Sequence, residues 1–377
     1  MAGPDAVAPR RILVVKLADI GDAVLATPAI SALRRAFPTA RIDALTTPNA
    51  RAVLSLCPSV DRTIDFPKAL FDRPRDLTHP GRLAALPRLA ARLRAQHYDT
   101  VVLLHHLTTA FGTVKFRALV RATGAPQVAG LDNGRGHFLT HRAIDLGFGA
   151  RTEWEYGLDI VGALGVDPTG ARPALRIPEA ARAAADRRLA AAGVHGPVVV
   201  IHPGVGPYSQ ARAWPAARFA AVARELRATT GLPVVVVGTH AEAASAAGLR
   251  AVDGVVDLLG ATTVAELAAV LARAALVIGA DSGVAHLGAA LGRPTLAIFG
   301  PSNHDAWRPI GAAVHRVGER PFPDASALVV RADIPCAPCL YTGYTLGQRQ
   351  GCARRTCLDW VTASEVSAAA LHLLGQN

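Results

Sequence analysis

Short apolar runs alternate along most of this chain with longer stretches in which apolar and polar residues repeat at helical spacing. A continuous apolar run predicts a strand buried on both faces, and the stretches between such runs predict helices. The predicted strands cover 11–17, 42–45, 98–104, 128–130, 198–202, 234–238, 255–258, 276–279 and 295–299. The predicted helices cover 23–37 and 178–193, and the capping-box sequence Thr362-Ala363-Ser364-Glu365 opens a last one.

Strands that alternate with helices predict an α/β fold whose sheets are parallel and covered on both faces. A chain of 377 residues exceeds what one core usually supports, so two domains are expected. Two prolines interrupt the alternation between Arg172 and Pro178. We therefore predict one domain over 1–177 and a second over 178–377.

The most informative segment runs from Val277 to Gly300. An apolar run ends in Asp281-Ser282-Gly283, a small-residue helix with His286 in its first turn follows, and Gly-Arg-Pro leads into another apolar run. The predicted turn presents a hydroxyl and backbone N–H groups at a helix N-terminus, where phosphate binds well. Asp281 beside them either meets a sugar hydroxyl or orders the loop.

The first strand–helix turn, Lys16-Leu17-Ala18-Asp19-Ile20-Gly21-Asp22, argues against a dinucleotide-dependent dehydrogenase. It holds one glycine where the G-x-G-x-x-G fingerprint needs three, and a carboxylate where pyrophosphate would sit. Asp22 instead opens a helix at the strand carboxyl ends, as a partner of the helix dipole or as a general base. We favour the base, because Lys16 and Asp19 lie close by and the other half carries an anion site.

The composition is globular, with 51% apolar and 18% charged residues. The formal charge of +11 is carried by arginine, since only three of the 40 basic residues are lysine. This bias fits genomic drift or an anionic partner, such as a nucleotide, a phosphorylated glycan or an acidic membrane face. Aromatic residues make up only 5% and no basic run is interleaved with them, so a nucleic-acid partner is not expected.

The N-terminus shows no secretory pattern, because the first ten residues hold an aspartate and two prolines and no apolar region follows before the first strand. No stretch of about 18 uncharged apolar residues is present, so no transmembrane helix is expected. We expect a cytoplasmic protein, peripheral at the inner face of the inner membrane.

Four motifs, in their order and spacing, resemble glycosyltransferase family 9, the ADP-heptose:lipopolysaccharide heptosyltransferase family. They are the Lys16–Asp22 turn, His202-Pro203-Gly204, Arg212-Ala213-Trp214-Pro215, and Asp281-Ser282-Gly283-x-x-His286 followed by Phe299-Gly300-Pro301. The resemblance runs from about Arg11 to Val366. It implies a GT-B architecture, in which two Rossmann-like domains with parallel sheets face each other across a cleft.

The resemblance also implies roles for individual residues. The acceptor binds the N-terminal domain, where Asp22 is the general base and Lys16 and Asp19 are candidate acceptor contacts. The nucleotide sugar binds the C-terminal domain, and the reaction inverts the anomeric centre without a metal. The candidate donor contacts are Arg212 at the diphosphate, Glu242 at the nucleoside, and Asp281, Ser282, Gly283 and His286 along the site.

Plainer structural roles stay open for some of these residues. Arg212 is either a diphosphate contact or a solvated surface arginine, and the flexible loop at 204–207 favours the contact. His286 either lines the donor site or packs within its helix. His202 either touches the ligand or caps its loop.

Four cysteines near the C-terminus form a separate candidate site. The spacing Cys336-x2-Cys339-x12-Cys352-x4-Cys357 suits a tetrahedral structural zinc or iron ion. Because cytosolic disulfides are rare, a metal and free thiols are the alternatives. The resemblance adds that relatives which glycosylate autotransporter proteins hold structural iron in such a cluster. The isolated Cys57 is expected in the core.

A basic amphipathic segment runs from Arg73 to Arg94, where Arg82, Arg88 and Arg92 interleave with leucines. Such a helix suits a phosphorylated acceptor or an anionic membrane surface. It is equally typical of an ordinary surface helix in an arginine-rich protein.

These observations predict an inverting, metal-independent glycosyltransferase that moves heptose from ADP-heptose to a phosphorylated lipopolysaccharide core acceptor. One alternative is the same fold acting on another nucleotide sugar or on a protein acceptor. A nucleotide-sugar 2-epimerase is a second alternative. An inactive binding module is a third, and an intact Asp22 argues against it.

Overall fold

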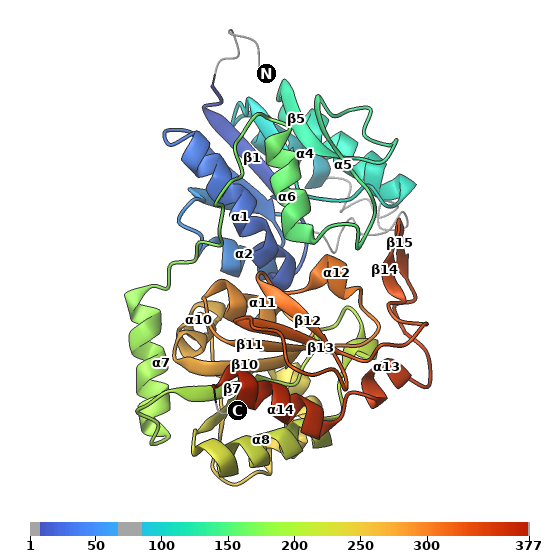
Figure 1. Cartoon of the computed structure of the whole chain (residues 1–377). Helices are drawn as coiled ribbons and strands as arrows, with labels where there is room; N and C mark the ends of the chain where they lie inside the picture. The colour runs from blue at the N-terminus through green and yellow to red at the C-terminus, as the bar shows by residue number, and fades with distance from the viewer. Residues whose placement is uncertain (1–7, 67–84, 376–377) are drawn as a thin grey trace. The chain divides into compact units, whose positions relative to one another are not determined.

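The computed structural model describes residues 8–66 and 85–375, and the chain divides into two compact units between Ala174 and Leu175 (Figure 1). This division lies close to the predicted boundary between 177 and 178. Each unit is described by itself.

The first unit is built on a parallel sheet that has six strands among the described residues. Its spatial order is β3-β2-β1-β4-β5-β6, and every neighbouring pair is parallel. The strands are β1 Arg11–Lys16, β2 Arg41–Thr46, β3 Arg62–Asp65, β4 Thr100–Leu103, β5 Gln127–Asp132 and β6 His141–Ile144.

Helices cover both faces of this sheet. They are α1 Ile20–Ala36, α2 Pro48–Leu54, α4 Ala85–Arg94, α5 Ala110–Thr123 and α6 Glu153–Gly162. On one face α1 packs against α2 and α6, and on the other α4 packs against α5 (Figure 1). Leu13 and Val15 of β1 pack with Phe116 of α5 and Leu93 of α4 in one buried cluster.

The second unit repeats this plan with a parallel sheet of seven strands among the described residues, in the order β12-β13-β11-β10-β7-β8-β9. Its strands are β7 Val198–His202, β8 Val234–Val236, β9 Val255–Asp257, β10 Ala274–Ala280, β11 Thr295–Phe299, β12 Ala312–Arg316 and β13 Ala327–Arg331. The central strands are buried along their whole length, as their apolar runs predict.

Helices again cover both faces. The longer ones are α7 Glu179–Ala191, α8 Ala216–Thr230, α9 Ala243–Arg250, α10 Val264–Ala272, α11 Gly283–Ala290 and α14 Ala363–Leu373. The short ones are α12 His304–Trp307, α13 Thr356–Asp359 and the single 3-10 turns η3 Gln210–Arg212 and η4 His240–Glu242. Helices α9 and α14 flank α8, while α10 packs against α7 and α11 (Figure 1). A small antiparallel hairpin, β14 Leu340–Thr342 with β15 Thr345–Gly347, lies within the cysteine-containing segment.

The predicted capping box before α14 is only half correct. The Thr362 hydroxyl caps the helix by accepting a hydrogen bond from the Glu365 amide at 3.2 Å. The Glu365 carboxylate does not return to the cap. It binds His315 at 2.6 Å and Arg320 at 2.9 Å instead, and the charged Arg320 guanidinium binds a carboxylate more strongly than a neutral backbone amide does.

The basic amphipathic segment is described only from α4 onward, and Arg73, Arg75 and Arg82 lie outside the described residues. In α4 the arginines are exposed, while Leu93 is buried and Leu86 and Leu89 pack against the core of the unit. The apolar face of this helix therefore belongs to the protein's own core. Among the described residues, no helix is both long and apolar enough to cross a membrane.

Each sheet has one topological switch point, where the strand order reverses. In the first unit it lies between β1 and β4, and in the second between β7 and β10. Ligands of open α/β sheets bind at the carboxyl ends of the strands beside such a point. The residues that follow these four strands therefore occupy the position where such sheets bind ligands.

Candidate active site

At the switch point of the first unit, Lys16 and Asp22 form an ion pair. Lys16 ends β1 and its side chain is buried, and Asp22 lies in the first turn of α1 with about a quarter of its side chain exposed, 24%. The Lys16 Nζ lies 3.4 Å from the Asp22 Oδ1 and 3.8 Å from the Glu153 Oε2. Asp19 is the exposed N-cap residue of α1, and its side chain makes no capping bond.

The Asp22 carboxyl has the properties of a general base. Burial raises its pKa above the usual aspartate range, Glu153 and Asp19 raise the pKa further, and Lys16 opposes the shift. A half-buried carboxylate with a raised pKa accepts a proton more readily than an ordinary aspartate. Its partial exposure leaves one side open to an incoming hydroxyl.

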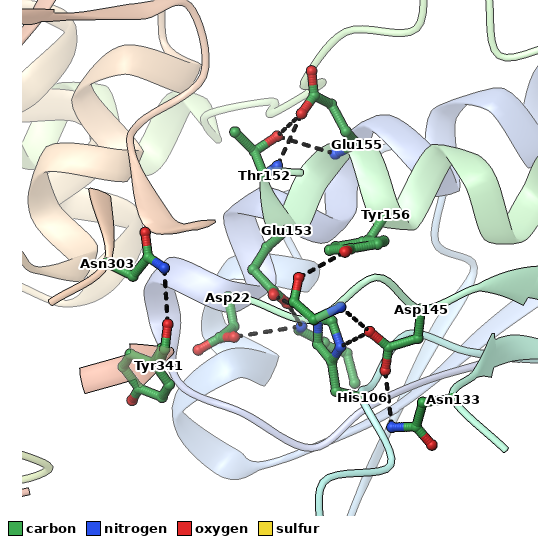
Figure 2. A network of polar contacts seen from close by, with 12 residues as sticks. Asp22, His106, Asn133, Asp145, Thr152, Glu153, Glu155, Tyr156, Asn303 and Tyr341 are labelled. Carbon is green, nitrogen blue, oxygen red and sulfur yellow. Dashed lines mark hydrogen bonds and ion pairs between the residues drawn. The ribbon is translucent and has the colours of Figure 1, made fainter. Parts of the chain in front are cut away.

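Behind this pair, His106 bridges two carboxylates (Figure 2). Its Nε2 lies 2.8 Å from the Glu153 Oε1 and its Nδ1 lies 3.0 Å from the Asp145 Oδ1. The Asn133 amide donates to the other Asp145 oxygen at 3.1 Å. Burial alone would lower the pKa of His106, but the two carboxylates outweigh burial and raise that pKa to about 9. The ring is therefore a buried cation at neutral pH.

Strand pairing and a helix cap bring His106 and Glu153 together. His106 follows β4, the neighbour of β1, so its position is set by the parallel pairing of these strands. Glu153 opens α6, whose start is a complete capping box between Thr152 and Glu155 (Figure 2). That box holds the first turn of α6 in place, and α6 packs on α1. The Tyr156 hydroxyl then donates to the Gly147 carbonyl at 2.7 Å.

The switch point of the second unit holds a different arrangement. Arg212, at the end of the loop after β7, lies with its Nη1 3.3 Å from the Asp281 Oδ2 and donates from Nη2 to the Val205 carbonyl at 2.7 Å. Asp281 follows β10, and Ser282 is the N-cap of α11, which begins at Gly283. A guanidinium from the loop after β7 thus lies beside the Ser282 hydroxyl and the first amides of α11, which follow β10. Such a combination is typical of a diphosphate site.

His202 joins this turn to η4. Its Nδ1 lies 3.0 Å from the Ser282 Oγ and its Nε2 lies 3.4 Å from a Glu242 oxygen. Burial alone would raise the pKa of Glu242, but bonds from His202 and Thr239 hold that pKa at about 2. A Cβ at position 204 would clash with the Glu242 carboxylate, so a side chain there would displace that carboxylate.

His286 is buried in α11, and burial lowers its pKa to about 4, so the ring is neutral. Among the described residues, no group hydrogen-bonds to its Nδ1. A neutral imidazole in the first turn of α11 fits a residue that lines the site without adding charge.

Comparison with known proteins agrees with this geometry. Residues 86–331, well over half of the chain, match the family model of glycosyltransferase family 9, described as heptosyltransferase. The chain belongs to glycosyltransferase family 9. It is therefore a glycosyltransferase, and its α/β fold with two Rossmann-like units is of the GT-B class.

Relatives of this family 9 chain include lipopolysaccharide heptosyltransferase 3 of Escherichia coli. The two are 28% identical over 317 residues, which span 77% of this chain and 83% of that protein. Among solved structures, a family 9 glycosyl transferase from Veillonella parvula covers 98% of both chains at 22% identity and a TM-score of 0.73. The E. coli ADP-heptose lps heptosyltransferase II covers 97% of this chain and 99% of its own at 21% identity and a TM-score of 0.69.

The cysteines of this glycosyltransferase lie near one another but not as a ligand set. Burial raises the pKa of the Cys357 thiol to about 11, and Cys339, Cys352 and Cys336 raise it further. Within residues 8–66 and 85–375, no three His, Cys, Asp or Glu side chains are arranged to hold a metal ion. The structural metal stays a prediction. Cys57 is buried, as expected.

The segment between Cys339 and Cys357 supports the loop that carries Arg212. The Arg349 guanidinium lies 4.4 Å from the Tyr208 ring centre, and its Nε donates to the Tyr208 carbonyl. The Arg349 carbonyl accepts from the Ser209 hydroxyl at 2.6 Å. The cysteine-containing segment therefore braces the donor-side loop from outside.

The structure brings the predicted residues together within each unit. Lys16 pairs with Asp22 while Asp19 stays exposed beside them, and Arg212, Asp281, Ser282, Gly283, Glu242 and His286 surround the second switch point. Sequence reasoning missed His106, Asp145 and Glu153. The one available signal was the His105-His106 pair directly after a predicted strand.

Proposed function

We propose that this glycosyltransferase moves heptose from ADP-heptose to a phosphorylated lipopolysaccharide core acceptor, with inversion and without a metal. The observation that carries the proposal is the partly exposed carboxylate of Asp22 at the first switch point, whose pKa is raised. The names of the relatives support heptose and lipopolysaccharide as the substrates.

In the proposed reaction, Asp22 takes the proton of an acceptor hydroxyl as its oxygen attacks the anomeric carbon. The new carbon–oxygen bond forms on the face opposite the bond to the diphosphate. That older bond breaks, and its electron pair leaves with ADP. Since attack and departure use opposite faces, the anomeric configuration inverts. Lys16 and Asp19, beside the base, are the candidate acceptor contacts.

The departing ADP gains negative charge, and three features of the second unit suit that charge. Arg212 supplies a cation, Ser282 a hydroxyl and α11 its first backbone amides. Asp281 orients Arg212, His286 lines the turn, and Glu242 is the candidate nucleoside contact. A fixed guanidinium takes the role that a divalent metal has in other transferases, so we expect activity to survive a chelator.

A nucleotide panel tests the donor. ADP and ADP-heptose should raise the melting temperature, whereas UDP and GDP sugars should not, because only a ligand of the native state stabilises it. Equal stabilisation by a UDP sugar would overturn the heptose proposal in favour of another donor or the 2-epimerase. Release of free sugar and UDP without an acceptor separates those two. Transfer to a protein acceptor, with lipopolysaccharide core inert, would overturn the proposed acceptor.

Two further expectations belong to this proposal. Elemental analysis of protein purified without added metal should find about one equivalent of zinc or iron, lost in Cys339→Ser; four freely titrating thiols and no metal would contradict it. The exposed arginines of α4 suit a phosphorylated acceptor or an anionic inner-membrane surface. Co-sedimentation with anionic and neutral vesicles checks the second of these.

A further inference from the structure

Five charged side chains of the first unit form a continuous row, of which the proposed reaction uses only one end. In order they are Asp145, His106, Glu153, Lys16 and Asp22. Figure 2 labels four of them, Asp145, His106, Glu153 and Asp22. Successive partners are 3.0, 2.8, 3.8 and 3.4 Å apart. They come from five separate places in the chain: β1, α1, the ends of β4 and β6, and the start of α6.

The row is closed to solvent except at Asp22. The side chains of Asp145, His106, Glu153 and Lys16 are at most 6% exposed, against 24% for Asp22. Charges alternate along it, with two cations between three carboxylates. Buried charges interact over longer distances than exposed ones because little water screens them. A change of charge at His106 therefore changes the electrostatic potential at Asp22.

His106 and Glu153 do not touch the acceptor. The cavity lined by Lys16, His106 and Glu153 has a volume of about 10 Å³. This is about the space of one water molecule, so a sugar ring does not fit. His106 and Glu153 therefore affect the chemistry only through their charges, which act on Lys16 and on Asp22.

Lys16 lies between the carboxylates of Asp22 and Glu153. The charge on His106 determines how strongly Glu153 attracts the Lys16 ammonium. While His106 is protonated it neutralises Glu153, and the Lys16 ammonium remains available to Asp22. If His106 carried no charge, Glu153 would compete for Lys16 and its own negative charge would act on Asp22. The carboxylate at the open end would then bind its proton more tightly.

We propose that His106 and Glu153 are positioning residues that act on the Lys16–Asp22 pair with opposite signs: His106 favours the ionised base at neutral pH, and Glu153 opposes it. This inference rests on the proposed role of Asp22 as the general base. It predicts that the two residues act on the base with opposite signs. If the row only stabilised the fold, the two substitutions would not shift the pKa of the base in opposite directions.

The groups that face Asp22 determine the direction in which each variant should move its pKa. Lys16 from β1 lowers its pKa, whereas Glu153 from α6 and Asp19 at the start of α1 raise it. His106 faces Glu153 and Asp145, and the neighbouring His105 accepts the Leu17 amide. Removing the His106 charge leaves Glu153 uncompensated, so the pKa of Asp22 rises. Removing the Glu153 charge lowers that pKa.

The test is the pH dependence of kcat/KM with ADP-heptose and deacylated lipopolysaccharide core, whose acidic limb reports the base in the free enzyme. In His106→Gln the limb should move to higher pH, and in Glu153→Gln to lower pH, each by roughly 0.5–1 unit at an effective dielectric near 20. The double variant should fall between them. Limbs that stay in place, or that move in the same direction in both variants, would overturn the proposal.

Controls separate this proposal from the proposed function. His315→Gln removes a buried histidine–carboxylate pair of the second unit, and it should leave the limb in place. Asp22→Asn must lose transfer; if it does not, the base assignment fails before the row is tested. If His106→Gln does not fold, Glu153→Gln alone still decides the sign. An NMR titration of His106 in the free protein adds a readout apart from activity, since its pKa should fall in Glu153→Gln.

Discussion

The two switch points differ in how their charged side chains are held. In the first unit the charged side chains pair with one another and are buried, so little besides Asp22 faces solvent. In the second, Arg212 pairs with Asp281 and also donates to the Val205 carbonyl, and the loop that carries Arg212 is bonded to Arg349 of the cysteine-containing segment. A base needs a defined pKa, which a closed row of charges supplies. An anion site needs a cation beside free backbone amides, which Arg212 and the first turn of α11 supply.

The largest expected effect is at the open end of the row. Asp22→Asn should lower transfer by about 10²–10⁴-fold, because asparagine cannot take the hydroxyl proton. ADP affinity should stay nearly unchanged, since asparagine keeps the size of the side chain at the helix start. Single-turnover transfer and calorimetric titration with ADP measure the two effects.

Asp19→Asn is the matched control for that variant, because Asp19 lies in the same turn and is exposed. It should transfer at a rate close to that of the unchanged protein. The double variant tests whether Asp19 rescues any activity. Transfer by Asp22→Asn at the unaltered rate would leave Asp22 as a helix-terminal carboxylate only.

The next effect concerns stability of the first unit at alkaline pH. The folded pKa of His106, about 9, lies above its ordinary value of 6.5. Its contribution is therefore complete below pH 6.5 and is lost as the pH rises through 9, by at most about 3 kcal/mol. Calorimetric melting between pH 6 and 10 should show this loss in the unchanged protein. In His106→Gln the loss should be smaller, and an identical slope would contradict the buried cation.

A third prediction concerns ADP binding at the switch point of the second unit. Arg212→Ala should weaken ADP binding by about tenfold or more, since a charge-assisted contact contributes roughly 1.5–3 kcal/mol. Titration calorimetry measures this loss. Arg224→Ala removes an exposed arginine on α8 and should bind ADP normally. ADP affinity that is equal in the two variants would remove Arg212 from the site.

The smallest effect tests the brace behind the loop. Arg349→Ala removes the guanidinium stacked on Tyr208, an interaction worth about 0.5–1 kcal/mol at such sites. ADP affinity should fall by about two- to fivefold with transfer from bound donor unchanged, and Arg349→Lys should recover part of it. A fall in kcat with KM unaltered would assign Arg349 a different role.

Interior strands were predictable because their signal is local. β7 and β11 are continuous apolar runs, and every residue in them is buried. β3 and β6 were not predicted, since each is an edge strand with only one buried residue and therefore no apolar run. The central strand β13 was also missed, although its residues are all buried.

Side-chain partners followed local rules only where no stronger partner arrived from elsewhere. At Thr362 the cap formed as its sequence predicts, whereas the Glu365 carboxylate was taken by His315 and Arg320 from distant parts of the chain. Thr152 and Glu155 kept their complete capping box, with Glu155 bonded to both the amide and the hydroxyl of Thr152.

The sequence by itself determined that two candidate residues follow strands of parallel sheets. It placed Asp22 and Asp281 in turns that follow apolar strands, and strand ends of parallel sheets share one edge. Only the tertiary structure decided that His106 would stand between Asp145 and Glu153. These three residues follow different elements, and strand order with helix packing brings them together. The charge of His106, and through it the state of the base, therefore depends on contacts that no local pattern encodes.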